Sequence, residues 1–229
     1  MAVLHGIDVS YANGALDWEA IKLTGEVDFA ILRAGYGQNN LDAQFLSNVQ
    51  GCVDYSIPFG IYWFSYALSE QNATAEGNFA CDRLEATGAT LSLGIWYDWE
   101  YDSDDYAAAH GVTITPYIRE QFALAFLEAC AGRGYSAGIY TNPDYLNRGL
   151  QGVVNAGWPL WLAQWGVSSP SRPCSIWQYG ITHITGITGD FDGDLMGDDY
   201  PPIPPIPGPG PTPTNKRKMP LWLYLRRYF

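Results

Sequence analysis

Short apolar runs alternate with segments of helical periodicity along the first 200 residues of this chain. Eight runs have the length and content of buried strands, at 3–9, 28–35, 58–66, 93–100, 136–142, 160–165, 174–180 and 189–194. Helical patterns lie at 17–25, 41–55, 69–88 and 115–134, with starts marked by Asp17, Ser69 and Thr115. Strands separated by helices favour parallel pairing. Because the connections shorten towards the end, we predict a single irregular TIM-like α/β barrel of about eight strands with reduced helices in its last third.

The chain changes character near residue 200. Residues 201–214, PPIPPIPGPGPTPT, predict a stiff polyproline II linker. Residues 215–229 hold five of the twelve basic residues and no acid, whereas the part before them carries 24 acids and seven bases. We therefore expect a barrel domain at 1–200, a linker at 201–214 and a basic aromatic tail at 215–229. The tail is either an anchor on anionic wall polymers or lipid head groups, or an unstructured end with no dedicated target.

Charge and composition exclude some classes of partner. The formal charge of −12 argues against nucleic acid, because phosphate binding needs clustered Lys and Arg. No stretch approaches the roughly 20 apolar residues of a membrane span, and the start MAVLHGIDVS does not resemble a secretion signal. The four widely spaced cysteines predict buried thiols. We expect a monomer that is made in the cytoplasm.

Polar and aromatic side chains gather where the predicted strands end. In a parallel barrel these ends meet at one mouth, where such folds hold their sites. The acids there are Asp8, Asp98, Glu100 and Asp192, and the other side chains include Arg33, Tyr62, Tyr140, Gln164, Trp165 and Trp177. Aromatic faces stack on sugar rings while Tyr and Trp keep their hydrogen-bonding groups free. The pattern indicates an acidic aromatic cleft, although core packing explains many of the aromatic residues equally well.

The stretch GIWYDWE places two acids one residue apart at the end of an apolar strand. Residues i and i+2 of a strand face the same side, about 6.5 to 7 Å apart, so Asp98 and Glu100 would share one space. Two carboxyl groups in a cleft walled by Trp and Tyr do not both ionise easily, and one is expected to keep its proton near neutral pH. Glycoside hydrolysis uses such a pair, with a protonated acid for the leaving oxygen and a second carboxylate for the charge at the anomeric carbon.

The order and spacing of eight segments resemble those of the muramidases of glycoside hydrolase family 25. The segments are GIDVSYANGALDW, FAILRAGYG, PFGIYWFSYA, GIWYDWE, AGIYTN, PLWLAQW, IWQYG and GITGDFD, over residues 5 to about 196. The resemblance implies an irregular β/α barrel that cleaves the β-1,4 bond between N-acetylmuramic acid and N-acetylglucosamine in peptidoglycan glycan strands. We expect no cofactor.

The resemblance also implies roles for the residues at the mouth. Glu100 would be the proton donor, Asp98 its partner, and Asp8 and Asp192 the supporting acids. Tyr62, Gln164, Trp165 and Trp177 would line the subsites together with Tyr140, and Arg33 would be a structural or substrate-contacting cation near Asp8. Trp63 stands where many family members have His, which leaves the subsite preference open. Either the N-acetyl oxygen of the substrate attacks the anomeric carbon, or water attacks directly with inversion.

The sequence also contains the spacing of a metal loop, and two other functions are compatible with an aromatic cleft. Asp190, Asp192 and Asp194 have the spacing of a calcium loop, but Leu195 and Pro201 occupy the positions of its Gly and Glu, so we expect no metal site. A non-catalytic peptidoglycan- or chitin-binding barrel would have the aromatic cleft without all four acids. An N-acetylglucosaminidase or a chitinase-like hydrolase is the other alternative.

The biological setting follows from the same features. A wall hydrolase without a signal peptide, with a short linker and a basic tail, is typical of a phage endolysin that is released to lyse the host cell wall. A bacterial autolysin exported by another route is the alternative.

Overall fold

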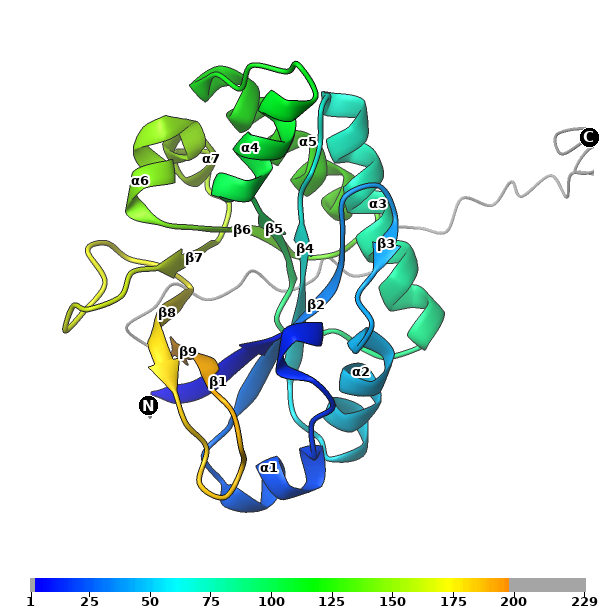
Figure 1. Cartoon of the computed structure of the whole chain (residues 1–229), viewed down its shortest axis with the longest axis vertical. Helices are drawn as coiled ribbons and strands as arrows, with labels where there is room; N and C mark the ends of the chain where they lie inside the picture. Colours follow the sequence, from blue (N-terminus) through cyan, green and yellow to red (C-terminus); the bar gives the residue numbers. More distant parts are fainter. Residues whose placement is uncertain (1–2, 198–229) are drawn as a thin grey trace, which may run out of the picture.

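The computed structural model describes residues 3–197, whose strands close into a barrel (Figure 1). The strands of the barrel are β1 (Leu4–Val9), β2 (Phe29–Tyr36), β4 (Phe59–Phe64), β5 (Ile95–Asp98), β6 (Ala137–Thr141), β7 (Leu160–Ala163), β8 (Ile176–Thr182) and β9 (Phe191–Met196). Each pairs with its neighbour in the order β1-β9-β8-β7-β6-β5-β4-β2, and the pairing of β1 with β2 closes the ring. A two-residue strand, β3 (Asn40–Leu41), is added to the end of β2. The predicted TIM-like barrel is confirmed.

The last strand departs from the parallel pairing that the sequence pattern favours. β9 runs antiparallel to both β1 and β8, whereas the other pairs of the ring are parallel. The reason is the connection at 183–190, which holds no helix and is shorter than the dozen or more residues of a parallel crossover. A hairpin therefore supplies the strand that closes the barrel.

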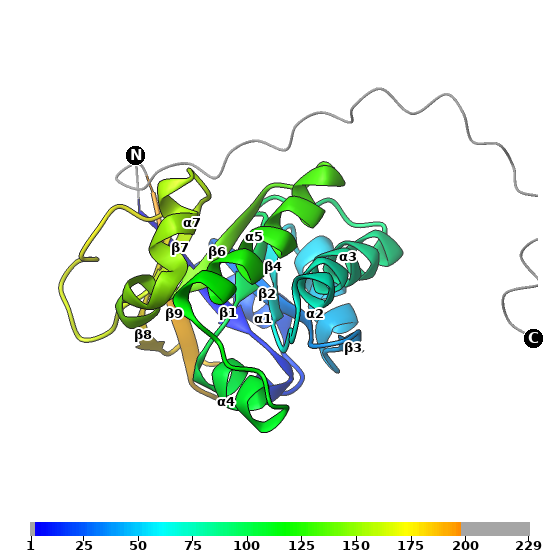
Figure 2. The ribbon, with the colours of Figure 1, turned by 90° about the horizontal axis from the view of Figure 1, so that it is seen from above.

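The four predicted helices are present, close to their predicted limits. They are α1 (Trp18–Thr24), α2 (Phe45–Asp54), α3 (Glu70–Thr87) and α5 (Pro116–Gly132). Asp17, Ser69 and Thr115 each accept a hydrogen bond from a backbone N–H of the first helical turn, as N-cap residues do. α3 and α5 pack side by side on the outside of the strands (Figures 1 and 2).

Three further α-helices and a π-helical turn were not predicted. α4 (Tyr101–Ala109) directly follows β5, and α6 (Pro143–Tyr145), a π-helical turn (Leu146–Leu150) and α7 (Gln151–Asn155) connect β6 to β7. The sequence of α4, YDSDDYAAA, lacks an apolar stripe, so periodicity did not reveal it. Its acidic first turn is nevertheless typical of a helix start. Within residues 3–197 no helix follows α7, in agreement with the expected loss of helices in the last third.

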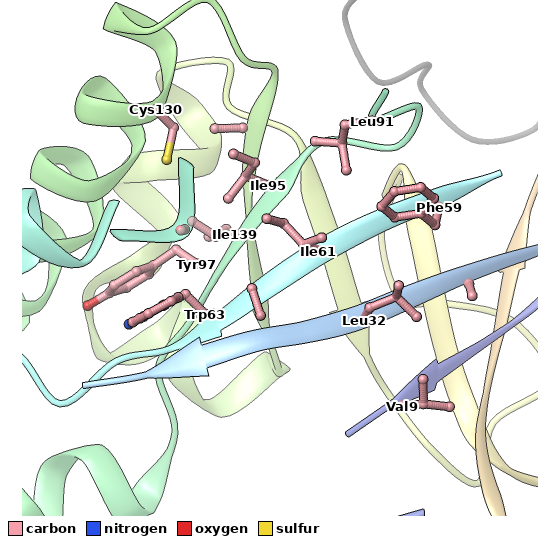
Figure 3. Close-up of a cluster of buried hydrophobic side chains, with 14 of the residues drawn as sticks. Val9, Leu32, Phe59, Ile61, Trp63, Leu91, Ile95, Tyr97, Cys130 and Ile139 are labelled. Atoms are coloured by element: carbon pink, nitrogen blue, oxygen red, sulfur yellow. The ribbon is translucent and has the colours of Figure 1, made fainter. Parts of the chain in front are cut away.

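Alternate residues of each strand face two different cores. An outer core between the strands and the helices contains Leu32, Ile61, Trp63 and Tyr97 (Figure 3). An inner core fills the barrel with Phe29, Ile31, Leu93, Trp96, Trp161 and Ile176. Glycine makes room for these rings: a Cβ atom at Gly138 would lie 2.4 Å from Cζ3 of Trp96. The barrel is therefore filled below its mouth, and a site is left only above this layer.

The remaining predictions concern the cysteines, membrane-spanning helices and the segments after residue 200. All four cysteines are buried and free, which confirms the prediction of buried thiols. Among residues 3–197, no helix has the length and apolar character needed to cross a membrane. The predicted linker at 201–214 and tail at 215–229 lie outside the described residues.

Candidate active site

The carboxyl ends of the strands surround a cavity of about 160 Å³ at the mouth of the barrel. Ten residues line it: Asp8, Arg33, Tyr62, Phe64, Asp98, Glu100, Tyr140, Trp161, Gln178 and Asp192. The structure thus brings together all four predicted acids, and Arg33, Tyr62 and Tyr140 of the predicted binding residues. The ten lining residues come from all eight strands of the barrel and from Glu100 at the start of α4, so only the closed barrel assembles them.

The triplet Asp98-Trp99-Glu100 lies at the junction of a strand and a helix. The predicted strand 93–100 ends earlier, because β5 stops at Asp98 and Glu100 is the N-cap residue of α4. Glu100 is still extended, with φ −130° and ψ −171°. Trp99 between them is fully buried, and both acids line the cavity. The expected sharing of one space is therefore found, although only the first acid belongs to the strand.

The start of α4 is anchored below Glu100 by side chains. The backbone N–H of Glu100 donates to Ser103 Oγ at 3.1 Å. Asp104 on the same helix accepts from Trp99 Nε1 at 3.0 Å, from Arg119 Nη2 at 2.8 and 2.9 Å, and from the hydroxyl of Tyr145 at 2.9 Å. These bonds join α4 to α5 and α6, so the backbone that carries Glu100 has a defined position.

Both acids of the triplet hold their protons more tightly than usual. Burial raises the pKa of Asp98 well above its ordinary value, and the charges of Glu100 and Asp8 raise it further, while Arg33 acts against them. Burial also raises the pKa of Glu100, against a hydrogen bond from Tyr140 that lowers it. Two carboxyl groups in one dry cavity repel each other when both are ionised. The site therefore favours a state with a proton on the pair, as an acid catalyst needs.

Gln178 connects Asp8 to the opposite wall of the cavity. Its Nε2 donates to Asp8 Oδ2 at 2.8 Å. Its Oε1 accepts from the hydroxyl of Tyr140 and from Trp165 Nε1, both at 3.0 Å. Burial raises the pKa of Asp8 well above its ordinary value, and this donor from Gln178 acts in the opposite direction. The network holds Asp8 and Tyr140 in place around the cavity.

Strand β8 carries Trp177, a predicted subsite residue whose side chain does not line the cavity. Trp177 and Gln178 are neighbours on β8 and face opposite sides. Gln178 lines the cavity, while Trp177 lies in the outer core and donates from Nε1 to the carbonyl of Gln164 at 2.9 Å. The side chain of Gln164 accepts from the backbone of Ser171. Trp177 and Gln164 therefore lie outside the cavity lining, and the half-exposed Trp165 reaches it only through Gln178.

Three lining residues had no predicted site role. Phe64 ends β4, Gln178 lies within β8, and Trp161 is the second residue of β7 and belongs to the inner core. Strict alternation would have identified the first two: counting by two from Tyr62 gives Phe64 and makes Trp63 an outer residue, and Gln178 alternates with Trp177. Trp63 is indeed fully buried in the outer core, and its Nε1 donates to the carbonyl of Gly37 at 3.1 Å. The residue that replaces the His of many family members thus does not line the cavity.

Arg33 lies between the cavity and a second hollow of about 440 Å³. Its Nε donates to Asp42 Oδ2 at 2.7 Å, and its guanidinium stacks 4.7 Å from the centre of the Tyr11 ring. The second hollow is lined by Tyr11, Arg33, Tyr36, Leu41, Asp42, Ala43, Phe64, Tyr66 and Asp102. Arg33 and Phe64 border both hollows, so the two lie side by side at the mouth of the barrel.

The described residues form no metal site. No group of three or more His, Cys, Asp or Glu side chains within 3–197 is placed to hold a metal ion. Asp190 instead pairs with His183, with Nε2 and Oδ1 2.9 Å apart. Asp192 and Asp194 belong to β9, so the acids of the apparent calcium motif are not gathered in one loop.

Known proteins share the sequence pattern and the fold of this chain. A family model described as "Glycosyl hydrolases family 25" matches residues 7–186. Lysozyme M1 of Streptomyces globisporus is 27% identical over 197 residues, 82% of this chain and 66% of that protein. The autolytic lysozyme of Clostridium acetobutylicum is 24% identical over 198 residues, 85% of this chain and 56% of that protein. The chain therefore spans less than two thirds of either relative. A bacterial lysozyme of Streptomyces coelicolor, whose structure is solved, is 25% identical with a TM-score of 0.69, over 85% of this chain and 92% of its own.

Proposed function

The chain belongs to glycosyl hydrolases family 25, and from that membership we propose that it is a lysozyme-type peptidoglycan hydrolase. The bond it would cleave is the β-1,4 bond between N-acetylmuramic acid and N-acetylglucosamine. The observation that carries the proposal is the meeting of Asp8, Asp98, Glu100 and Asp192 in one cavity, with a raised pKa on each. A cleft that only bound glycans would not need four acids in a place where burial opposes their charge.

Glu100 is the proposed proton donor. It is only partly buried, at the rim of α4, so a glycosidic oxygen can reach it, and its raised pKa keeps the proton available. Its backbone N–H donates to Ser103 Oγ, and its carboxyl group lines the cavity where the substrate would bind. After the leaving group departs, the ionised carboxylate would act as the base that activates water.

Asp98 is the proposed partner at the anomeric centre. Its Oδ1 is buried and finds no hydrogen-bond partner among the described residues, so the protein leaves this oxygen unsatisfied. In the substrate-assisted route, Asp98 would hold and polarise the N-acetyl group of the substrate. The carbonyl oxygen of that N-acetyl group would then attack the anomeric carbon. In the alternative, water attacks directly. Following the released anomer by NMR separates them, because a product of inverted configuration would exclude the substrate-assisted route.

The sugar-contacting residues are proposed from the cavity lining. Tyr62, Tyr140 and Arg33 border the acids, and Trp165 presents a half-exposed ring beside Gln178. Aromatic walls around a charged centre suit sugar rings, which have apolar faces and polar edges. We do not assign Gln164 and Trp177 to the subsites, because their side chains lie elsewhere.

The biological setting is a proposal of its own. We propose a phage endolysin that is made in the host cytoplasm and reaches the bacterial wall after release, with an autolysin as the alternative. Residues 215–229 would supply contact with anionic wall polymers or with the membrane surface. The barrel with its linker and tail would work as a monomer.

The proposed reaction is tested by the new ends that it creates. Purified peptidoglycan is digested by the wild type, by Glu100→Gln and by Glu128→Gln, a control on the exposed face of α5. The products are reduced with borohydride and identified by mass spectrometry. We expect reduced muramic acid ends from the wild type and the control, and a loss of at least about 100-fold in Glu100→Gln, because the general acid is missing.

Other products would change the assignment. Reduced glucosamine ends would identify an N-acetylglucosaminidase or a chitinase-like hydrolase. Binding without new ends from any of the three proteins would identify a glycan-binding barrel.

A further inference from the structure

Asp194 is a fully buried acid that lies below the catalytic cavity. It follows Asp192 by two residues on β9, so both side chains face the barrel interior. Its Oδ1 accepts a hydrogen bond from Trp161 Nε1 at 2.8 Å, and its side chain has no exposure to solvent. Its Oδ2 has no hydrogen donor among the described residues. An ionised carboxylate in this position would therefore be removed from water, and only one of its two oxygens would accept a hydrogen bond.

Strand pairing places Asp8 next to Asp194 inside the barrel. Asp194 pairs with Gly6 on β1, two residues before Asp8, and with Gln178 on β8, whose Nε2 donates to Asp8 Oδ2 at 2.8 Å. A hydrogen bond between the two carboxyl groups contributes to the pKa of both acids. The titratable groups that face Asp194 are Asp8 on the neighbouring strand β1 and Asp192 on its own strand. The other neighbour, β8, presents Gln178, and β7 beyond it presents Trp161; neither side chain is titratable in the physiological range. Two ionised carboxylates in contact would repel each other in a dry site. Burial and the charge of Asp8 both raise the pKa of Asp194 well above its ordinary value. One proton shared by the pair relieves both costs.

We propose that Asp194 is a positioning residue that keeps its proton and donates it to Asp8, which fixes the Asp8 carboxylate in the cleft. Asp8 then receives two hydrogen bonds, from Asp194 and from Gln178 Nε2. Both favour its ionised form, in a site where burial opposes it. The result is a fixed negative charge where positive charge develops on the sugar during hydrolysis. This inference rests on the proposed function.

Two substitutions separate a protonated acid from an ionised one. Asn has the shape of a neutral carboxyl group, and its amide can accept from Trp161 and donate to Asp8, as protonated Asp194 does. Leu has a similar branched shape and can do neither. We expect Asp194→Leu to lower kcat by about 100-fold, because Asp8 loses its orientation. Asp194→Asn should recover most of that loss. The control is Asp190→Asn, which changes an acid that is 72% exposed on the same side of the barrel.

The protonation state has a direct spectroscopic signature. The infrared difference spectrum between the wild type and Asp194→Asn at neutral pH should contain the C=O stretching band of a protonated carboxylic acid. The spectrum for Asp190→Asn should not. In Asp194→Leu, the acidic limb of kcat should also move to higher pH, because Asp8 has lost a bond that favours its charge.

The proposal is overturned by any of three results. These are the absence of the infrared band, a loss in Asp194→Asn as large as in Asp194→Leu, or full activity of a folded Asp194→Leu. If Asp194→Leu does not fold, the infrared band and the kcat of Asp194→Asn decide. If the wild type produces no muramic acid ends, the proposed function fails, and the infrared band still shows whether Asp194 keeps its proton.

Discussion

The two acids of the Asp98-Trp99-Glu100 triplet have different environments although they share one cavity. Asp98 is buried, and its Oδ1 has no partner among the described residues. Glu100 is partly exposed, and Tyr140 and Asp102 act on its charge in opposite directions. The different environments of the two carboxyl groups suit them to different roles in catalysis. In the proposed reaction, the more accessible acid, Glu100, would exchange its proton, while the buried acid, Asp98, would stabilise charge.

Asp102 tunes the proton affinity of Glu100. The negative charge of this exposed residue of α4 raises the pKa of Glu100, because it opposes a second negative charge. Asp102→Asn removes that charge and should lower the pKa of Glu100. The proton is then lost at lower pH, so we expect the alkaline limb of kcat/KM to move down by roughly 0.2 to 0.7 pH units.

The matched control for this prediction is Asp105→Asn, on the same helix and also exposed. Its charge does not appear among the groups that act on Glu100. Rates measured from about pH 4 to pH 9 should show the shift for Asp102→Asn alone. An unchanged limb, or an equal shift in both variants, would contradict the role of Asp102.

At the level of elements, α4 is the support of the proposed acid. It starts at Tyr101, directly after Glu100, and Asp104 in its first turn joins the helix to α5 and α6. Arg119, the main partner of Asp104, is 4% exposed and has its own Nε unpartnered among the described residues. Asp104 therefore compensates the charge of a buried guanidinium that has little contact with water.

Asp104→Ala should destabilise the protein strongly, because it leaves Arg119 as an uncompensated buried charge. We expect the free energy of unfolding to fall by about 3 kcal/mol. The comparison is Asp144→Ala, which removes the partner of Arg148 in a pair whose side chains are about half exposed. That change should cost under about 1 kcal/mol. Urea unfolding of both variants measures the free energy of unfolding. Equal decreases would show that the buried ion pair contributes no more to stability than the exposed one.

At the level of the whole molecule, the barrel is closed by a strand of opposite direction. β9 lies between β1 and β8, and it carries Asp192 to the cavity and Asp194 to the layer below. The inner core beneath them is filled by Trp96 and Trp161. The site is therefore a shallow cleft above a packed interior, open to a polymeric substrate from one side.

The tail prediction also belongs to the whole molecule. Deleting residues 215–229 should weaken sedimentation with purified cell walls at low salt, because five basic side chains are lost. Turnover of soluble muropeptides should be nearly unchanged. The control replaces the five basic residues with Gln and keeps the aromatic residues, which isolates the charge. Equal wall binding by the intact and deleted proteins would reject an anchor.

The sequence by itself determined the features that depend on local pattern. Apolar runs and cap residues located the strands and four of the helices, and the spacing of Asp98 and Glu100 predicted two acids in one space. The acids from distant strands were also expected at one mouth. Asp8 and Asp98 lie at the carboxyl ends of parallel strands, whereas Asp192 reaches the mouth from the start of the antiparallel β9.

Only the tertiary structure decided the features that depend on contacts across the barrel. Alternation states that Trp177 and Gln178 face opposite sides, but the neighbouring strands decide which one faces the cavity. The direction of β9 likewise depends on the closure of the ring, and α4 depends on Arg119 more than on an apolar stripe of its own. The sequence pattern assigned no site role to Asp194. Its burial beside Asp8 results from the pairing of β9 with β1, two strands that lie far apart in the chain. Contacts between such distant segments are set by how the strands pack, which local periodicity does not record.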